Sequence, residues 1–73
     1  MIEQKIVTAI AETIGRERTK RGMTQLDLSK KCCIAKSTIS RIETCEGIPS
    51  LINACILLDA LGYELTIQKK EGI

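Results

Sequence analysis

The 73-residue sequence contains no histidine, tryptophan or phenylalanine, and only one tyrosine and one proline. The absence of histidine removes the commonest general base and metal ligand near neutral pH. No other residues are spaced as a nucleophile–base pair or as a glycine-rich phosphate loop. Four cysteines are present, but none belongs to a C-x-x-C pair that could begin a zinc site. The sequence therefore predicts a protein that is not an enzyme and that has no catalytic site, metal site or cofactor.

Long hydrophobic runs are also missing. No stretch reaches the roughly 18 apolar residues of a membrane span, and no basic-then-apolar signal peptide opens the chain. We therefore expect a cytoplasmic protein without a membrane partner. In that compartment Cys32, Cys33, Cys45 and Cys55 should remain reduced and act as small hydrophobic residues. Redox sensing through Cys33 or Cys45 is the alternative.

Charge is unevenly distributed along the chain. Residues 15–41 contain eight lysines and arginines against two acidic residues, which gives +6. Residues 42–73 contain two lysines and five acidic residues, which gives a net charge of −3. Residues 1–14 contain one lysine and two acidic residues, which gives −1. A basic half suits a polyanion such as nucleic acid and leaves the other half for a different partner.

The order of apolar residues predicts one domain, residues 1–73, with four helices. In residues 3–21 isoleucines recur every four positions, which is one face of a helix that Gly22 ends. These isoleucines are Ile2, Ile6, Ile10 and Ile14. Two short helices follow within 24–44, and a fourth is expected over 50–61. A chain this small buries only about 60% of its unfolded surface, so dimerisation is a common remedy.

Residues 24–44 contain two short helical patterns with almost nothing between them. Leu26 and Leu28 are the apolar residues of the first pattern, and Ile39 and Ile42 face inward from the second. Two helices joined by a turn of three or four residues form a helix-turn-helix, whose second helix lies in the DNA major groove.

Four short strings follow one another in a characteristic spacing: T-Q-x-x-L-S, I-x-x-S-T-I-S-R-I-E, P-S-L and A-L-G. Together they resemble the phage Cro/repressor (Xre-like) helix-turn-helix family over residues 10–62. The resemblance implies an all-α, four-helix domain that binds double-stranded DNA. The tail ALGYELTIQKK also resembles small antitoxin-type members, in which a final strand pairs across a homodimer and a toxin protein is a partner.

The second helix of the motif is expected to run from Lys36 to Thr44 and to read DNA. Side chains near its start reach furthest into the groove, so Lys36 and Ser37 are the first candidates for base contacts. Arg41 lies one turn later and can bind the O6 and N7 atoms of a guanine. The remaining outward residues are expected to reach phosphates or the groove wall. These are Thr38 and Ser40.

Thr24 is the N-cap candidate of the first helix of the motif, and Gln25 follows it. The free N–H groups and partial positive charge at this helix start suit a DNA phosphate. In the family, the glutamine at this position has that role. The family resemblance also implies that Arg18 pairs with Glu43, the glutamate that ends the recognition helix. A bidentate pair would hold two helices in a fixed relation. The alternative is that Arg18 is a solvated cation.

Two turns depart from the family pattern. Cys33 and Cys45 stand where family members commonly have glycine, because the backbone there favours positive φ. A non-glycine residue in that conformation costs on the order of 1 kcal/mol. We therefore expect either strained or slightly shifted turns at both positions.

The fourth helix is apolar nearly all round, which predicts burial on more than one side. Its expected core face consists of Leu51, Ala54, Cys55, Leu58 and Leu61. The apolar residues outside that face are Ile52, Ile56 and Leu57. Because one small chain cannot cover all sides of this helix, we expect a partner surface at Ile52 and Ile56.

After Gly62 the hydrophobic period changes to alternation, which predicts a strand over 63–69. Its apolar residues are Tyr63, Leu65 and Ile67. A lone strand has no ladder partner in its own chain, so we expect it to pair with the strand of a second copy. With the exposed side of the fourth helix, these residues form the predicted homodimer interface.

The predicted function is sequence-specific binding of a palindromic operator by a repressor of its own operon. Within this class, the antitoxin of a toxin–antitoxin pair competes with a stand-alone phage or restriction-modification regulator, and the tail favours the antitoxin. The alternative from another class is a protein-interaction module that has kept the fold and lost DNA binding. Strong salt dependence of DNA binding would distinguish the two classes.

Overall fold

Four α-helices make up most of the chain in the computed structural model, which describes residues 2–72 and all their side chains except that of Ile2. The helices are α1 (Ile2–Lys20), α2 (Gln25–Cys32), α3 (Lys36–Glu43) and α4 (Leu51–Ala60). Their bounds lie within one residue of the prediction, and the all-α class is confirmed. No helix within the described residues has the length and apolar character needed to cross a membrane.

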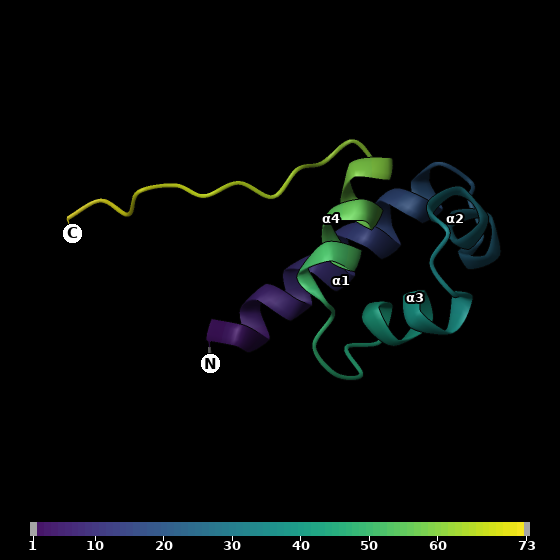
Figure 1. Cartoon of the computed structure of the whole chain (residues 1–73), viewed down its shortest axis with the longest axis horizontal. Coiled ribbons are helices and arrows are strands. Elements are labelled where there is room, and N and C mark those ends of the chain that lie inside the picture. Colours follow the sequence, from purple (N-terminus) through teal and green to yellow (C-terminus); the bar gives the residue numbers. More distant parts are fainter. Residues whose placement is uncertain (1, 73) are drawn as a thin grey trace.

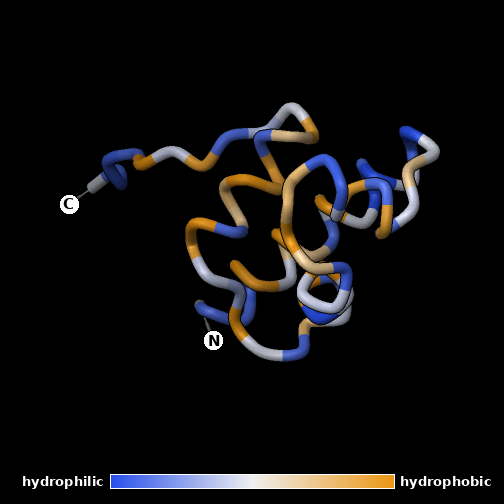
Figure 2. Tube along the Cα trace, turned by 45° about the vertical axis from the view of Figure 1, so that its right-hand side comes forward, coloured by the Kyte–Doolittle hydropathy of each residue, from blue (hydrophilic) through white to orange (hydrophobic). Residues whose placement is uncertain are grey.

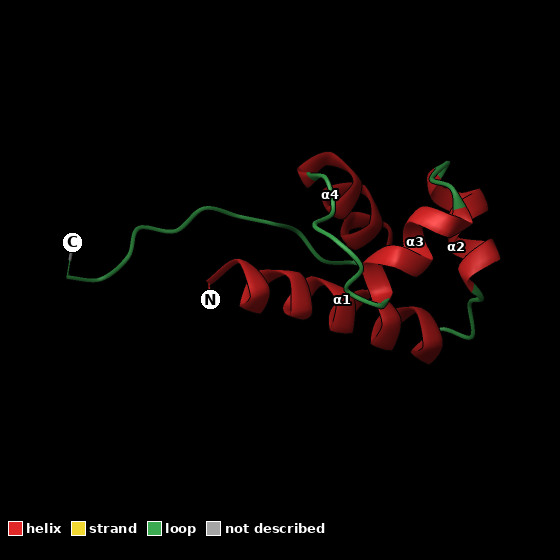
Figure 3. Cartoon of the chain, turned by 90° about the horizontal axis from the view of Figure 1, so that it is seen from below, coloured by secondary structure: helices red, strands yellow, loops and turns green. Residues whose placement is uncertain are grey.

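The long helix α1 is the element against which the others pack. It contacts α3 and α4, and α2 contacts both of these as well. Figure 1 shows α2 and α3 together at one end of the molecule, while the first turns of α1 and the C-terminal residues extend toward the other end. The view in Figure 3, turned by 90°, shows the same division.

The core is built from aliphatic side chains alone, because the sequence offers a single aromatic residue. Burying one leucine or isoleucine stabilises the fold by roughly 1.5–3 kcal/mol. The buried cluster contains residues from every helix and from the α2–α3 turn: Ile14, Leu28, Ile34, Ile39, Ile42, Leu57, Leu58 and Leu61. The inward direction predicted for Ile39 and Ile42 is confirmed.

Two predictions about side-chain direction in α4 are wrong. Leu51 is exposed, whereas Leu57 is fully buried. The buried residues of α4 and of its C-cap have the spacing i, i+3, i+4, i+7 and are Ala54, Leu57, Leu58 and Leu61. Leu51 is the first residue of its helix, so it lies at the end and not over the core. A helix that is apolar nearly all round gives no periodic contrast by which to choose its inner face.

The predicted strand over 63–69 is not a strand in this chain. Residues 63–70, which we call the C-terminal segment, form an extended stretch, and no residue between 2 and 72 belongs to a β-ladder. Figure 2 shows hydrophobic and hydrophilic residues alternating along this segment, as in the sequence. The physical reason is the one stated above: a single extended stretch has no neighbour in its own chain to accept its backbone hydrogen bonds.

Of the two outcomes expected at the cysteine turns, the structure has the left-handed backbone, with φ of 57° at Cys33 and 59° at Cys45. Replacing Cys33 by glycine should therefore remove roughly 1–2 kcal/mol of strain, which the greater freedom of glycine in the unfolded chain offsets by roughly 0.5–1 kcal/mol. The expected net result is a melting temperature a few degrees higher. Thermal unfolding followed by circular dichroism measures it.

The neighbouring Cys32 provides the matched control, because it is the last residue of α2 and has a helical backbone. Glycine at a helical position costs up to about 1 kcal/mol, so Cys32→Gly should melt at a lower temperature. If Cys33→Gly lowers the melting temperature as much as Cys32→Gly does, the left-handed backbone at Cys33 is not strained.

Candidate nucleic-acid interface

The outer face of α3 is polar and cationic. Its two isoleucines point into the core, which leaves the remaining side chains on the opposite face. Lys36, Ser37 and Arg41 are exposed, and Thr38 and Ser40 are half-buried. Within residues 2–72 neither Lys36 nor Arg41 takes part in an ion pair, so both charges are available to a polyanion.

The turn between α2 and α3 is fixed by Ser29. Its hydroxyl donates to the carbonyl of Ile34 at 2.6 Å, and its carbonyl accepts from the backbone N–H of Ile34 at 3.3 Å. The side chain of Ile34 is buried in the core. The corner therefore holds α3 at one angle to α2. Sequence reasoning missed this role of Ser29, although the residue belongs to the first string of the family resemblance.

A reciprocal capping box begins α2. The Thr24 hydroxyl oxygen accepts from the Asp27 N–H at 3.0 Å, and the Asp27 carboxylate accepts from the Thr24 N–H at 2.8 Å. The hydrogen bond from the Thr24 N–H is the largest cause of a lowered pKa at the Asp27 carboxyl, and the Thr24 side chain adds to it. The N-cap role of Thr24 is confirmed, but the role of Asp27 was missed because the common box has glutamate or glutamine there.

The capping box changes what the start of α2 can offer a phosphate. Asp27 places a negative charge where the helix N-terminus would otherwise attract an anion. The backbone N–H of Thr24 is occupied. At the start of α2, the backbone N–H groups of Gln25 and Leu26 have no acceptor within the described part of the chain.

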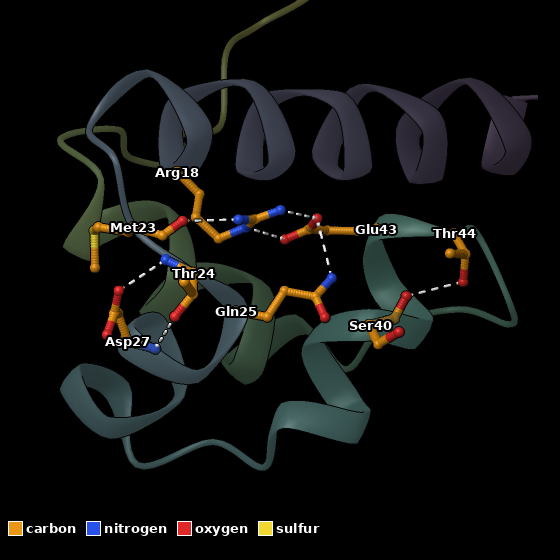
Figure 4. A network of polar contacts seen from close by, with 8 residues as sticks. All are labelled: Arg18, Met23, Thr24, Gln25, Asp27, Ser40, Glu43 and Thr44. Carbon is orange, nitrogen blue, oxygen red and sulfur yellow. Dashed lines mark hydrogen bonds and ion pairs between the residues drawn. The ribbon is translucent and has the colours of Figure 1, made fainter.

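A network of polar contacts connects α1, α2 and α3 (Figure 4). Arg18 Nε donates to Glu43 Oε2 at 2.8 Å, and Arg18 Nη2 donates to Glu43 Oε1 at 2.9 Å. The third guanidinium nitrogen donates to the Met23 carbonyl at 2.8 Å. The two side chains are only 17% and 11% exposed. The carboxylate raises the pKa of Arg18, chiefly through its hydrogen bonds.

Gln25 also joins this network. Its amide nitrogen donates to Glu43 Oε1 at 3.3 Å, as the dashed line in Figure 4 shows. One of its two amide hydrogens is therefore directed toward Glu43, and the other remains for an outside acceptor. The structure thus brings Arg18, Glu43 and Gln25 together at the place where α2 meets the end of α3.

A second polar cluster surrounds Glu17, which is 7% exposed. Its carboxylate accepts from the Tyr63 hydroxyl at 3.1 Å, from Arg21 Nη1 at 3.2 Å and from Arg16 Nε at 3.5 Å. The Tyr63 hydrogen bond is the largest cause of a lowered pKa at Glu17, and nearby positive charges, first Lys20, add to it. Sequence reasoning missed this cluster, because 46 residues separate Glu17 from Tyr63.

Ion pairs in the two clusters determine which basic residues remain unpaired and available to a polyanion. Three of the eight basic residues in 15–41 are paired with carboxylates, namely Arg16, Arg18 and Arg21. The others are exposed: Lys20, Lys30, Lys31, Lys36 and Arg41. Four of these five belong to α2 or α3. The available positive charge is therefore concentrated on the two helices of the predicted motif.

The residues predicted for a homodimer interface are all exposed in the single chain. They are Ile52, Ile56, Tyr63, Leu65 and Ile67. The first turns of α1 and the first residue of α4 add two more exposed large apolar side chains, Ile6 and Leu51. Exposed apolar groups that gather on one part of a small protein commonly mark an interaction surface.

The sequence profile of the helix-turn-helix family matches residues 14–68. The matched stretch contains α2, α3, α4 and the end of α1, and it leaves out the first turns of α1. No curated protein and no solved structure matched the chain.

Proposed function

Because the chain belongs to the Cro/repressor (Xre-like) helix-turn-helix family of DNA-binding regulators, we propose that it is a homodimeric repressor that binds a palindromic operator. The observation that carries the proposal is the outer face of α3. Three of its polar side chains, Lys36, Ser37 and Arg41, are exposed, and its two cations are unpaired within the described residues. The Ser29 contacts fix the turn that joins it to α2.

Base reading is assigned to α3. Lys36 and Ser37 stand at its first two positions, where side chains enter the major groove most deeply. Arg41 presents a forked donor that fits the O6 and N7 atoms of guanine. Thr38 and Ser40 are partly covered by neighbouring residues, which suits contacts with phosphates or the groove wall.

Phosphate anchoring is assigned to the start of α2. The second amide hydrogen of Gln25 and the backbone N–H groups of Gln25 and Leu26 can donate to one phosphate. Thr24 contributes indirectly, because its hydroxyl oxygen accepts from the Asp27 N–H and so fixes the first turn of α2. Since Glu43 holds the Gln25 amide, this anchor and the end of α3 keep a fixed separation.

Homodimer formation is supported by the exposed apolar residues of α4 and of the C-terminal segment. Pairing of two C-terminal segments would provide the ladder partner that one chain lacks. A two-fold dimer would also place two copies of α3 about one helical turn of DNA apart, roughly 34 Å. Two half-sites give more affinity and specificity than one small domain can obtain.

Repression of its own operon and an antitoxin role are the finer parts of the proposal. The antitoxin role, with a toxin as partner, is supported by the tail ALGYELTIQKK. A stand-alone phage or restriction-modification regulator would use the same DNA surface without a toxin. A protein-interaction module is favoured only by the exposed apolar side chains, and it predicts that no DNA binding, and therefore no salt-dependent affinity, is measured.

Replacing Arg41 by alanine tests the placement of the recognition surface. With a duplex selected from a random-sequence pool, the variant should lose about 1–3 kcal/mol of binding free energy and relax specificity at one base pair. Gln25→Ala should instead weaken binding to all sequences about evenly, because its proposed DNA contact is with a phosphate and not with a base. Mobility-shift titration measures both effects.

Lys5→Ala is the matched control, since it removes one positive charge from an exposed residue of α1 that lies outside α2, α3 and the C-terminal segment. It should leave operator affinity nearly unchanged. An Arg41→Ala protein that keeps full affinity and specificity would show that α3 does not read the bases.

A further inference from the structure

An apolar cleft of about 340 Å³ lies between α1, α4 and the C-terminal segment. Its lining consists of Ile6 and Ile10 of α1, Leu51 and Cys55 of α4, and Leu65, Thr66 and Ile67 of the C-terminal segment. Five of these seven residues are exposed, and Ile67 is fully so. The α1 wall precedes residue 14, so it lies outside the stretch that matches the family. Because most of its lining is exposed to solvent, a single chain leaves this cleft uncovered on one side.

The C-terminal wall of the cleft follows a fixed path at its start. The Tyr63 hydroxyl is bound to Glu17 of α1, and the Tyr63 N–H donates to the Leu58 carbonyl of α4 at 2.9 Å. The residues that follow then run beside α1, where Tyr63 and Leu65 border a smaller cleft of about 150 Å³ with Ile10. The segment is therefore held next to α1 in the single chain, without a partner.

We propose that a second copy of the chain closes the cleft with its own C-terminal segment, antiparallel, with Thr66 of one copy opposite Thr66 of the other. The inference rests on the proposed homodimer and adds its register and the contribution of α1. In a two-fold antiparallel pair centred on Thr66, Leu65 of each copy lies opposite Ile67 of the other. Opposite residues share a face, so these four side chains cover both clefts.

Alternative registers fit less well. A register shifted by one residue would turn Leu65 and Ile67 away from the apolar cleft and would put Glu64 and Gln68 over it. A parallel arrangement would place the two copies of Glu64 together and the lysines at 69 and 70 together. The antiparallel register instead brings Lys70 of one copy diagonal to Glu64 of the other, within reach of a long side chain.

A pair centred on Ile67 would bring Lys70 directly opposite Glu64, but it would also set Lys69 opposite Leu65, over the apolar cleft. A pair centred on Leu65 would set Ile67 opposite Tyr63, whose N–H is already donated to the Leu58 carbonyl. Hydrophobicity and the fixed start of the segment therefore favour the pair centred on Thr66.

Cysteine cross-linking tests the register. The background is Cys33→Gly with Cys45→Gly, which removes the two exposed thiols at positions with a backbone suited to glycine. Under mild oxidation Thr66→Cys should become a disulfide-linked dimer on a non-reducing gel. Gln68→Cys should not, because its two copies would lie roughly 13 Å apart along the strands, beyond the roughly 7 Å reach of a disulfide.

The background protein without an added cysteine measures any cross-linking through Cys32 and Cys55. Equal cross-linking at positions 66 and 68 would overturn the antiparallel register. A chain that sediments as a dimer but does not cross-link through Thr66→Cys would also overturn it, while leaving the proposed homodimer standing. A chain that sediments as a monomer would remove the homodimer itself.

The contribution of α1 has its own test. Ile6→Glu should raise the dimer dissociation constant at least about tenfold, because it would bury an unpaired charge. Glutamate is a good helix former, so α1 should persist. Ile48→Glu is the matched control: Ile48 is 78% exposed, Ile6 is 55% exposed, and Ile48 is not among the residues lining this cleft. Sedimentation equilibrium that shows the same dissociation constant for both variants would exclude α1 from the interface.

Discussion

Replacing Arg18 by alanine should lower the free energy of unfolding by roughly 3 kcal/mol, the lower end of the range for breaking a buried ion pair. The carboxylate of Glu43, in a side chain that is 11% exposed, would lose both of its guanidinium donors. Only the Gln25 amide at 3.3 Å would remain beside it. In a domain of this size 1 kcal/mol corresponds to about 4–8 °C, so the melting temperature should fall by more than about 10 °C.

Arg16→Ala is the control for this prediction, because it removes the same side chain two residues earlier on α1. Arg16 is 57% exposed and lies 3.5 Å from its carboxylate, so its loss should change the melting temperature little. A double-mutant cycle with Glu43→Ala separates the ion pair from the hydrogen bond that Arg18 donates to Met23. Equal melting temperatures for Arg18→Ala and Arg16→Ala would reject the structural role of the pair.

Removing residues 64–73 should convert the protein into a monomer whose operator affinity is lower by about a hundredfold or more. The reason is that linking two half-site readers makes the second contact effectively intramolecular, a gain of about 10²–10⁴ in affinity. This truncation keeps Tyr63 and its hydrogen bond to Glu17, so the four helices should still fold. Sedimentation measures the assembly, and mobility shift measures the affinity.

The matched control replaces residues 64–73 by a flexible glycine–serine stretch of the same length. It should behave like the truncated chain, because it supplies neither a strand-forming sequence nor apolar side chains. Far-ultraviolet circular dichroism verifies that both proteins keep their helices. A truncated protein that remained fully dimeric would show that the C-terminal segment does not hold the two copies together.

Local signals in the sequence predicted the local structure. Isoleucine spacing in α1, the cap at Thr24 and the glycine positions taken by Cys33 and Cys45 each depend on a few neighbouring residues, and each prediction is confirmed. The inner face of α4 was predicted incorrectly at Leu51 and Leu57 because hydrophobicity surrounds that helix.

Contacts between distant residues were harder to predict from the sequence. The expectation for Arg18 and Glu43 came from the family resemblance and not from spacing, since 25 residues separate them. The cluster of Glu17 and Tyr63 had neither a resemblance nor a local pattern to indicate it. A strand in the C-terminal segment would need a second chain to pair with. The sequence of one chain therefore predicts that the segment tends to form a strand, but not which strand it pairs with.

The position of Tyr63 has a spectroscopic consequence. It is the only aromatic residue in the chain, so it is the sole side-chain source of near-ultraviolet absorption and fluorescence apart from weak thiol contributions. Its hydroxyl is bound to Glu17 at the junction between the helices and the C-terminal segment, and none of the aliphatic core carries a chromophore. Tyrosine emission therefore reports on the environment of this junction, whereas far-ultraviolet dichroism reports on the helices. Different midpoints for the two optical signals would reveal that the segment detaches from α1 before the helices unfold.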